Sequence, residues 1–487
     1  MNISKVATKQ IIIIFSIIYI IANAIFIVNE FYWLNLLPLA LLFFYLLFFH
    51  FEKYVFILIA LLPISVPLHS IIKGLEFDIS LPAEALIIMA MLFFIYKLAF
   101  DLKYNNRILK HPVTIAILFY LSWIFLTSVT STMPLVSFKF LASKIWFIVV
   151  FYFILSHIFI KYKNFFIYLW SFVLPLIIVI IYASYRLYQG GMVNTISVAN
   201  QVAVPFFPDH TSYAAALAML IPVLASIFFI KRKAKGIQNI GFVVVLLIYF
   251  LALIFSYTRA AWLSLLAASI FIIPAMLRIK LNVTLITAFL ITTLIYSNWT
   301  NIQLVLSQNR QASSGSLTKH VSSVSNISTD ASNLERINRW HSAIRMFEEK
   351  PIVGFGPGTY MFKYAPFQVT NDKTIISTNA GNRGNAHSEY LGPLAESGIL
   401  GILSFVAIVL TTIFTASRVF FTSKRKKVKY LALALMIGLI SYDIHGGMND
   451  FLDIDKLNAL FWGFTAMIVA LDVFHNNNSE NKSIFRY

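Results

Sequence analysis

The sequence Gly384-Asn-Ala-His-Ser-Glu-Tyr-Leu-Gly-Pro-Leu-Ala-Glu-Ser-Gly-Ile-Leu-Gly401 joins the one long polar segment of this chain to a long apolar run. His387 stands just before that run, among small residues and close to the carboxylates of Glu389 and Glu396. An imidazole titrates near neutral pH, so it is the side chain best suited to act as an acid or a base. The junction therefore predicts a chemical site where polar and apolar sequence meet.

The composition outside this junction is that of a membrane protein. Of 487 residues, 59% are hydrophobic and 12% are charged, with a mean hydropathy of +0.80, whereas about a quarter of the residues in soluble domains are charged. The first apolar run, from Ile11 to Val28, is long enough to remain as a spanning helix, which needs roughly 20 residues, and no small-residue cleavage site follows it. We expect an all-α polytopic membrane protein.

The apolar segments give the expected number of spans. The third is short and contains Pro63 and Pro67, so it is either a span or a re-entrant segment, and the expected total is about 12–14 transmembrane helices. The segments lie near residues 10–28, 31–49, 54–68, 83–100, 112–130, 140–160, 164–185, 210–230, 238–257, 261–278, 281–298, 397–420, 430–447 and 457–474.

Basic residues predict the orientation, because Lys and Arg collect in short cytoplasmic loops. With both termini in the cytoplasm, the clusters at 97–110, 161–163, 231–235, 278–280 and 424–429 all fall on the cytoplasmic side. The net charge of +18 then reflects membrane topology, and a nucleic-acid partner is not implied. The long polar loop lies on the extracytoplasmic side in this orientation.

Three regions follow from this topology. Residues 1–298 form an N-terminal transmembrane bundle, 299–396 the extracytoplasmic loop, and 397–487 the C-terminal helices with a cytoplasmic tail. Within the loop, 306–333 is rich in Ser, Asn and Thr and is expected to be flexible. Residues 334–350 have helical apolar spacing and predict an amphipathic helix across the mouth of the bundle, opened by a capping box of Ser332 and Glu335. The motif of His387 occupies 384–396.

Between that helix and His387, the sequence Gly354-Phe-Gly-Pro-Gly358 has two interpretations. A dinucleotide-binding loop needs a preceding strand, which the pattern does not predict here. A tight structural turn that folds the backbone toward the bundle fits the proline and the glycines better.

Arginines supply the second class of candidate side chain. Arg259 lies between two apolar runs, where an ionisable group is a functional candidate by default, the alternative being an arginine that snorkels to the interface. Arg336 and Trp340 share one face of the 334–350 helix, and Arg339 points about one residue aside. Lys139, Lys144 and Arg186 also lie near the outer ends of spans, and snorkelling explains each of them better than phosphate binding.

The surroundings of His387 separate it from an ordinary structural histidine. Asn385, Ser388 and Glu389 offer polar partners, and Glu389 or Glu396 is expected to orient the ring and hold its pKa near neutrality. Asp450, Asp453 and Asp455 form an acidic group that has the oxygen ligands of a hard metal site, although a solvated turn is the better interpretation.

Together these motifs resemble the O-antigen ligase and O-antigen polymerase superfamily. The resemblance rests on the order and spacing of Ser256-Tyr-Thr-Arg259-Ala-Ala-Trp, Arg336-x-x-x-Trp340, Pro351-Ile-Val-Gly-Phe-Gly-x-Gly358, Ala386-His-Ser-Glu-Tyr-Leu391 and Ala395-Glu-x-Gly-x-x-Gly401. It extends over residues 200–420. Phe207-Pro-Asp-His210 is similar to the motif before an earlier span, where the family more often has Asn than His.

The resemblance implies a GT-C-like glycosyltransferase of the bacterial inner membrane that needs no cofactor and no metal. Its donor would be a glycan linked to undecaprenyl diphosphate, and its acceptor another glycan or the lipid A core. Arg259 and Arg336 would bind the diphosphate, with Arg339 as the alternative to Arg336, and His387 would activate the acceptor hydroxyl. Asn385, Glu389, Glu396 and Trp340 would support this site. The sequence leaves open a polymerase of the same superfamily and, in another class, a flippase or secondary transporter.

Overall fold

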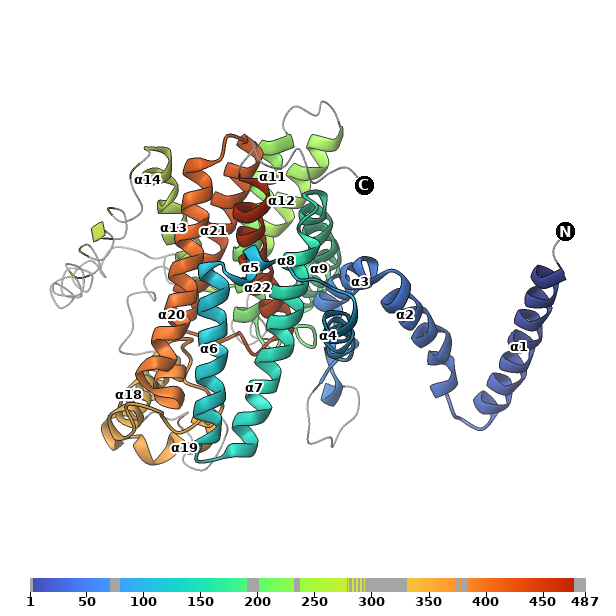
Figure 1. Cartoon of the computed structure of the whole chain (residues 1–487). Helices are drawn as coiled ribbons and strands as arrows, with labels where there is room; N and C mark the ends of the chain where they lie inside the picture. The colour runs from blue at the N-terminus through green and yellow to red at the C-terminus, as the bar shows by residue number, and fades with distance from the viewer. Residues whose placement is uncertain are drawn as a thin grey trace. The chain divides into compact units, whose positions relative to one another are not determined.

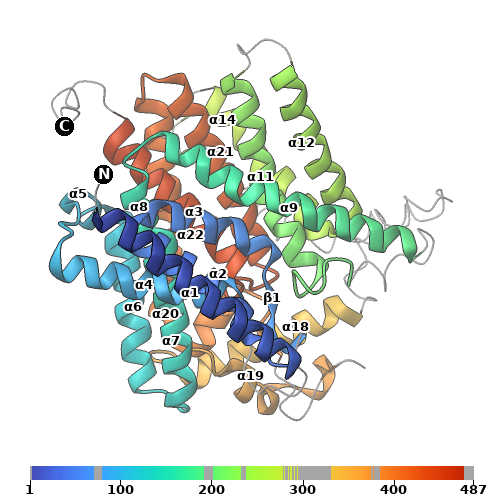
Figure 2. The ribbon, with the colours of Figure 1, turned by 90° about the vertical axis from the view of Figure 1, so that its right-hand side faces the viewer.

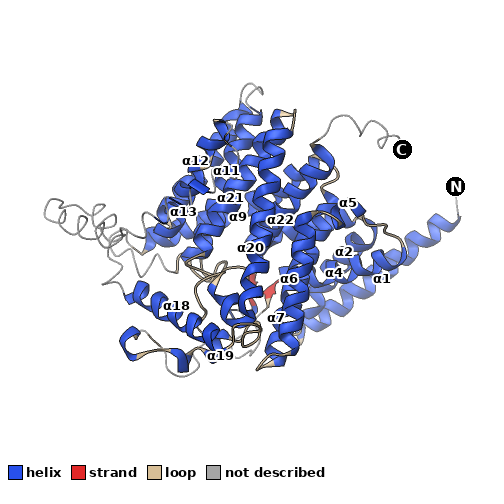
Figure 3. Cartoon of the chain, turned by 60° about the vertical axis from the view of Figure 1, so that its left-hand side comes forward, coloured by secondary structure: helices blue, strands red, loops and turns tan. Residues whose placement is uncertain are grey.

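The computed structural model describes residues 3–70, 79–190, 201–231, 237–277, 331–373 and 384–476, with Ser377 and isolated positions between 279 and 293. The chain divides into two units, residues 1–58 and 59–487. Helices make up most of the described chain, as Figure 3 shows, and its two strands have two residues each. β1 (Val66–Pro67) pairs antiparallel with β2 (Ser80–Leu81). The predicted all-α class is confirmed.

The first unit consists of apolar helices that leave large side chains uncovered. α1 (Ile3–Val28), the 3-10 helix η1 (Trp33–Leu36) and α2 (Leu37–Phe49) lie in it, and α3 (Phe51–Leu61) begins there. Exposed Ile, Leu and Phe side chains run along α1 and α2. Such surfaces suit a lipid environment, where apolar side chains need no cover from water.

The second unit contains the remaining helices (Figure 1). In chain order they are η2 (Leu62–Ile64), η3 (Leu68–Ser70), α4 (Ala83–Phe100), α5 (Asn106–Leu109), α6 (Pro112–Val129), α7 (Pro134–Ile148), the π-helical η4 (Val149–Ile154), α8 (Leu155–Ile158), α9 (Lys163–Gln189), α11 (His210–Lys231), α12 (Ile237–Phe255), α13 (Arg259–Ile270), α14 (Ile272–Met276), α18 (Ala331–Glu349), α19 (Tyr360–Lys363), η6 (Ala365–Phe367), η7 (Thr370–Asp372), α20 (Leu391–Thr422), α21 (Lys426–Gly446), α22 (Asp455–Ala470) and the π-helical η8 (Leu471–His475).

Most predicted spans are found. In the described part of the chain, nine helical segments are long and apolar enough to cross a membrane, and three shorter apolar helices cover Ile13–Val28, Trp33–Phe49 and Ile240–Phe255. The span expected at 54–68 is wrong, because α3 ends at Leu61 and a 3-10 turn with Pro63 and the short strand β1 follow. Proline removes a backbone donor and stops the helix there. Most of the span expected at 281–298 lies outside the described residues.

The second unit is built by packing between helices that are far apart in the sequence. α11 packs against α21, and α20 packs against both α6 and α21. Almost all of α22 is buried, and Figure 2 shows the helices of this unit from a second side. A Cβ atom on Gly438 would lie 2.5 Å from the carbonyl oxygen of Met219. The absence of a side chain at Gly438 therefore allows α21 and α11 to approach closely.

This bundle has two ends, and the connections at one of them carry the predicted motifs. We call it the loop end. It includes the turn between α6 and α7, the start of α11, the turn between α12 and α13, and residues 351–360, 384–398 and 446–455. In Figure 1, α18 and α19 lie with the α6–α7 turn at this end, and α14 and the α20–α21 turn lie at the other. Arg425 and Lys426 are in that opposite turn.

Helix α18 forms a platform at the loop end with a small core of its own. The predicted helix at 334–350 is thus confirmed, and it packs against α20. Because Ser332 lies inside α18, the predicted capping box does not begin the helix. Apolar side chains of α18, of the glycine turn, of α19 and the residue after it, of the loop before α20 and of the start of α20 form the core under it: Ala343, Met346, Phe355, Tyr360, Tyr364, Ala386 and Ala395.

The glycine sequence 354–358 is the structural turn that the sequence favoured. Gly354, Gly356 and Gly358 all have positive φ, a conformation that costs glycine little. A Cβ atom on Gly354 would lie 2.3 Å from the backbone of Glu396. The turn also bonds to the bundle, since Thr132 donates its backbone N–H to the carbonyl of Phe355 at 2.9 Å.

Helix α20 is broken near the loop end. Gly398 has φ 68° and ψ −164°, which separates the short helix before it from the long span after it. The backbone of Pro351 closes on this break, because Ile399 donates its N–H to the Pro351 carbonyl at 3.0 Å. The break lets α20 begin beside the platform and then turn into the bundle.

Candidate active site

His387 lies at the loop end, in the short segment between α18's platform and α20. Its φ is +48°, unusual for a residue with a side chain. Buried Ala386 anchors the segment in the platform core, and the indole N–H of Trp340 donates to the His387 carbonyl at 3.4 Å. On the other side, Glu389 donates its backbone N–H to the carbonyl of Gly446 at 2.8 Å. The imidazole is therefore held between α18 and the end of α21.

Arg339 is a buried part of the platform. Its side chain donates from Nε to Oε1 of Glu335 at 2.9 Å and from Nη1 to the carbonyl of Asn385 at 3.0 Å, and the guanidinium lies 5.5 Å from the centre of the Tyr364 ring. A Cβ atom at Gly384 would lie 1.9 Å from Nη1. Arg339 thus holds the backbone that leads to His387.

Arg336 stands one turn earlier on α18 and is half-buried. Its charge acts on two histidines, His387 and His445 at the end of α21. Of the three candidate arginines, the structure therefore places Arg336 and Arg339 within electrostatic range of His387, and it adds a second imidazole that the sequence did not single out.

Arg259 is the first residue of α13 and is also at the loop end. Tyr257, two residues earlier, has φ +52°, so this turn is strained like the one at His387. The Thr258 hydroxyl donates to the carbonyl of His210 at 3.3 Å, which ties the turn to the start of α11. Asp209, next to His210, is within electrostatic range of His387.

The electrostatics of His387 differ from the expected tuning to neutrality. Burial, and after it the positive charges of Arg339 and Arg336, lower the pKa of His387 to about 4. The carboxylates that act in the opposite direction are those of Asp209 and Glu335. The expectation of a pKa near neutrality is therefore wrong for the structure without ligand, because two cations stand beside a desolvated ring. At pH 7 the ring is neutral and can accept a proton.

Glu335 is the anion that balances this group of cations. Burial by itself raises the pKa of Glu335, but hydrogen bonds from Ser377, Arg339 and Asn338 outweigh it and lower that pKa. Glu335 therefore stays ionised, and its side chain pairs with Arg339.

Glu389 and Glu396 have other partners than the His387 ring. Glu389 Oε1 accepts from the Tyr442 hydroxyl at 2.6 Å and from the backbone N–H groups of Phe451 and Leu452 at 2.7 and 2.8 Å. Glu396 accepts from the N–H groups of the glycine turn, at Gly358 and Tyr360. Both carboxylates fix the backbone around the site, in place of the expected contact with the imidazole.

Sequence reasoning missed two residues here, Asp209 and His445. Asp209 caps α11 by accepting from the Ser212 N–H at 2.7 Å, and its charge also reaches His387. Its place in Phe207-Pro-Asp-His210, a motif noted in the sequence, was the available signal. His445 belongs to the last turn of α21, where a histidine at the end of an apolar run resembles the setting of His387.

The acidic residues after α21 do not form the metal site considered from the sequence. Among the described residues, no group of three or more His, Asp or Glu side chains is arranged to hold a metal ion. Asp453 accepts from Nζ of Lys144 at 2.9 Å, and Asp455 pairs with Lys456 at 3.1 Å. A solvated turn is also wrong for Asp455, which is buried.

Two basic residues expected to snorkel are engaged by the protein. Lys144 is buried and also donates to the carbonyl of Leu452 at 2.6 Å. Arg186 donates to the carbonyls of Gln201 and Val204, both at 2.8 Å. Lys139 is exposed, as expected of a lysine at an interface.

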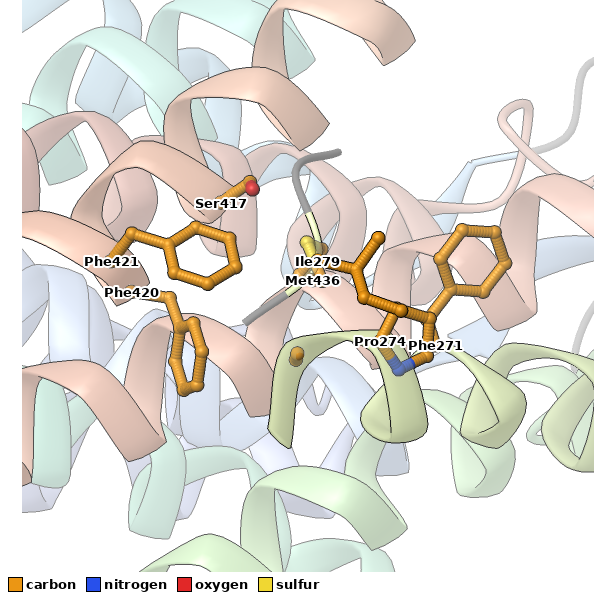
Figure 4. Close-up of a pocket in the computed structure, with 8 residues that line it drawn as sticks. Phe271, Pro274, Ile279, Ser417, Phe420, Phe421 and Met436 are labelled. Atoms are coloured by element: carbon orange, nitrogen blue, oxygen red, sulfur yellow. The ribbon is translucent and has the colours of Figure 1, made fainter. Parts of the chain in front are cut away.

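An apolar hollow lies at the opposite end of the bundle (Figure 4). It is separated from Gly398 by some twenty residues of α20, roughly 30 Å of helix. Its lining has no ionisable side chain, and consists of Phe271, Pro274, Ala275, Ile279, Ser417, Phe420, Phe421 and Met436. Without a group to transfer a proton or neutralise charge, this hollow is not the candidate site.

Comparison with known proteins gives two matches. A family model described as O-antigen ligase matches residues 242–406, a segment that includes Arg259, Arg336 and His387. An uncharacterized protein from Haemophilus influenzae is 26% identical over 205 residues, which cover 41% of this chain and 49% of that protein. The match thus spans about half the length of that relative.

The matched segment begins in α12 and ends in α20, and it contains every residue predicted for the site. Its helices also belong to a multi-pass membrane bundle. Residues 242–406 of this chain are thus similar to the O-antigen ligase family.

Proposed function

We propose that this protein is an O-antigen ligase-type glycosyltransferase of the bacterial inner membrane. It moves a glycan from undecaprenyl diphosphate to a hydroxyl of an acceptor, the lipid A core or another surface acceptor, on the extracytoplasmic face. The observation that carries the proposal is the placement of His387 within electrostatic range of Arg336 and Arg339, at the same bundle end as Arg259. A neutral base beside cations suits a reaction with an anionic leaving group.

The diphosphate needs charge neutralisation more than a proton, because it leaves as a stable anion. A guanidinium donates two parallel hydrogen bonds to phosphate oxygens and stays protonated at any working pH. Arg336 is only half-buried, and Arg339 already bonds Glu335 and Asn385. We therefore assign the diphosphate to Arg336 and Arg259, and a positioning role to Arg339.

His387 acts on the acceptor. Its neutral ring takes the proton of the acceptor hydroxyl while that oxygen attacks the anomeric carbon of the donor sugar. The bond from the anomeric carbon to the diphosphate oxygen breaks, and its electron pair leaves with undecaprenyl diphosphate. A single displacement of this kind inverts the anomeric configuration, and it requires neither a metal nor a cofactor.

The low pKa of His387 fits this order of events. In the free enzyme, burial and the two platform arginines keep the ring neutral and ready to accept a proton. Once the diphosphate is bound, its negative charge offsets the arginines, which raises the basicity of the ring. Binding of the donor thus makes His387 a stronger base before the proton is transferred.

A polymerase of the same superfamily is the second candidate, because the family match is shared by both activities. Analysis of lipid-linked glycans in a deletion strain separates them. A ligase deletion accumulates full-length glycan on undecaprenyl diphosphate and loses glycan on the acceptor. A polymerase deletion leaves single repeat units on the acceptor. A deletion strain with an unchanged glycan profile on both lipids would contradict the proposal.

A further inference from the structure

His445 is a second buried histidine of the loop end. It lies in the last turn of α21 and is 1% exposed. Its ring and that of Phe451 pack edge to face, with 5.5 Å between ring centres. In the part of the chain that the structure describes, neither ring nitrogen of His445 has a hydrogen-bond partner. Buried polar groups are nearly always paired, so a fully buried ring with two unpaired nitrogens needs an explanation.

The surroundings of His445 are those of the candidate active site. The charged and titratable groups that act on it are Arg336 of α18, and Asp209 and His210 at the start of α11. Arg336 and Asp209 also act on His387. The backbone joins the two histidines as well, since the Gly446 carbonyl accepts from the N–H of Glu389. Two further bonds close this junction, from Tyr442 to Glu389 and from Tyr390 to the Asp443 carbonyl.

A neutral imidazole has one donor and one acceptor nitrogen, and a sugar hydroxyl can both donate and accept. A phosphate offers only acceptors at this position, and the guanidinium of Arg336 is the better donor to it. We propose, on the basis of the proposed function, that His445 binds a hydroxyl of the sugar directly attached to the diphosphate. Its place beside Arg336 sets it next to the phosphate that Arg336 holds. His445 is then a sugar-recognition residue, separate from the base His387.

The test compares the affinity of the protein for undecaprenyl diphosphate with its affinity for the same lipid carrying a sugar. Purified full-length protein is titrated with undecaprenyl diphosphate and with the same lipid carrying N-acetylglucosamine, N-acetylgalactosamine or glucose. The wild type is expected to bind at least one sugar-bearing lipid more tightly than undecaprenyl diphosphate. His445→Phe should lose about 10-fold in affinity for that lipid, the worth of one good hydrogen-bond pair. Its affinity for undecaprenyl diphosphate should stay unchanged.

Thermal unfolding without ligand separates recognition from a structural role. Because phenylalanine fills the space without unpaired nitrogens, His445→Phe should melt at or above the wild-type temperature. His445→Asn, which keeps a donor and an acceptor, should restore part of the lost affinity. His341→Phe is the control, since His341 is a half-exposed histidine of α18 paired with Asp372, and it should change neither affinity.

The outcomes distinguish this inference from the proposed function. If the wild type favours a sugar-bearing lipid and His445→Phe favours it equally, His445 does not read the sugar, while the proposed function stands. A lower melting temperature for His445→Phe would assign the residue to the fold and overturn the inference. If the wild type binds none of the four lipids, both the inference and the proposed function fail.

Discussion

Two residues with positive φ, Tyr257 and His387, stand beside the two motifs that the proposed reaction needs most. Tyr257 lies two residues before Arg259, and His387 itself carries the candidate imidazole. Such backbone costs roughly 1–3 kcal/mol per residue and persists where the surrounding structure enforces it. Around His387 that enforcement is visible in the bonds of Trp340 and Glu389.

Replacing the base tests the role of this ring. His387→Ala should lower glycan transfer by about 10²–10⁴, the usual contribution of a general base, while expression and membrane insertion stay at wild-type levels. Transfer is measured as labelled glycan moved from the lipid to the acceptor in membranes. His341→Ala is the matched control and should transfer normally. Normal transfer by His387→Ala would remove His387 from the mechanism.

The depressed pKa of His387 predicts a pH profile. Only the neutral ring accepts a proton, so activity is present above the pKa and is lost as the pH falls through it. The acid limb of kcat/KM, which reports the free enzyme, should therefore lie near pH 4, well below the ordinary value of about 6.5. The limb of kcat should lie higher, because the bound diphosphate offsets the arginines.

Arg336→Gln provides the check on this pH profile, because removing one like charge should move the kcat/KM limb upward. A limb at pH 6.5 in the wild-type kcat/KM profile would show that neither burial nor the arginines lower the pKa of the base in solution.

Substitutions at Arg336 and Arg339 should differ in effect: one should lower the transfer activity and the other the stability of the protein. Arg336→Ala should lower transfer by about 10²–10³, as for other transition-state contacts, with an unchanged melting temperature. Arg339→Ala leaves Glu335 buried without its cation, a change that costs roughly 3–5 kcal/mol. It should lower the melting temperature of the purified protein. If Arg336→Ala melts early and Arg339→Ala stays stable, the two assignments are reversed.

The residues of the site were only partly predictable. Arg336, Trp340 and His387 followed from helical spacing and from the change between polar and apolar sequence. The partners of Glu389 and Glu396 did not, because they lie on segments remote in sequence, at Tyr442, Phe451 and Tyr360. The ring of His445 likewise becomes a candidate only when the fold shows that it is buried without a hydrogen-bond partner.

At the scale of elements, the glycine turn and the break in α20 position the platform. Pro351 and Ile352 pass directly over Gly398, and a Cβ atom there would lie 2.1 Å from the carbonyl oxygen of Ile352. The turn at 354–358 meets Glu396 on the other side of the same break. These contacts join the loop before His387 to the start of α20 as one assembly.

Gly398→Ala tests this assembly. The left-handed backbone and the clash should together destabilise the protein by roughly 2–5 kcal/mol, seen as a lower melting temperature and reduced transfer. Gly241→Ala in α12 is the control, because a Cβ atom at Gly241 would meet nothing within 4 Å and alanine favours helix. Equal melting temperatures for the two variants would show that the break at Gly398 tolerates a side chain.

Local pattern predicted some elements better than others. Apolar spacing identified α18 and most spans, since burial of one face and membrane thickness both leave periodic or continuous apolar sequence. The length rule wrongly predicted a span at 54–68, because the segment is as hydrophobic as a span but Pro63 stops the helix. The capping box failed because α18 begins before Ser332.

At the scale of the whole molecule, the account depends on which side of the membrane the loop end faces. The basic turn of Arg425 and Lys426 lies at the opposite end of the bundle, and the positive-inside rule assigns that turn to the cytoplasm. With this assignment, the candidate site at the loop end is predicted to face outward. We keep the proposed regions 1–298, 299–396 and 397–487 as a description of this topology.

Cysteine labelling tests the orientation, because the chain contains no cysteine. Thr370→Cys lies on an exposed site of the loop end, and Lys427→Cys on an exposed site of the opposite turn. A membrane-impermeant maleimide should label Thr370→Cys in intact cells, and Lys427→Cys only after the inner membrane is permeabilised. The reverse pattern would turn the candidate site toward the cytoplasm and contradict the proposed function.

The most direct measurement is a structure determined by electron cryomicroscopy with a non-reactive, sugar-bearing analogue of undecaprenyl diphosphate. The account predicts diphosphate oxygens within about 3 Å of the guanidinium groups of Arg259 and Arg336, with the anomeric carbon facing the ring of His387. A diphosphate bound away from the loop end, or one that contacts Arg336 while Arg259 turns from it, would contradict the claim that these three side chains form a single site.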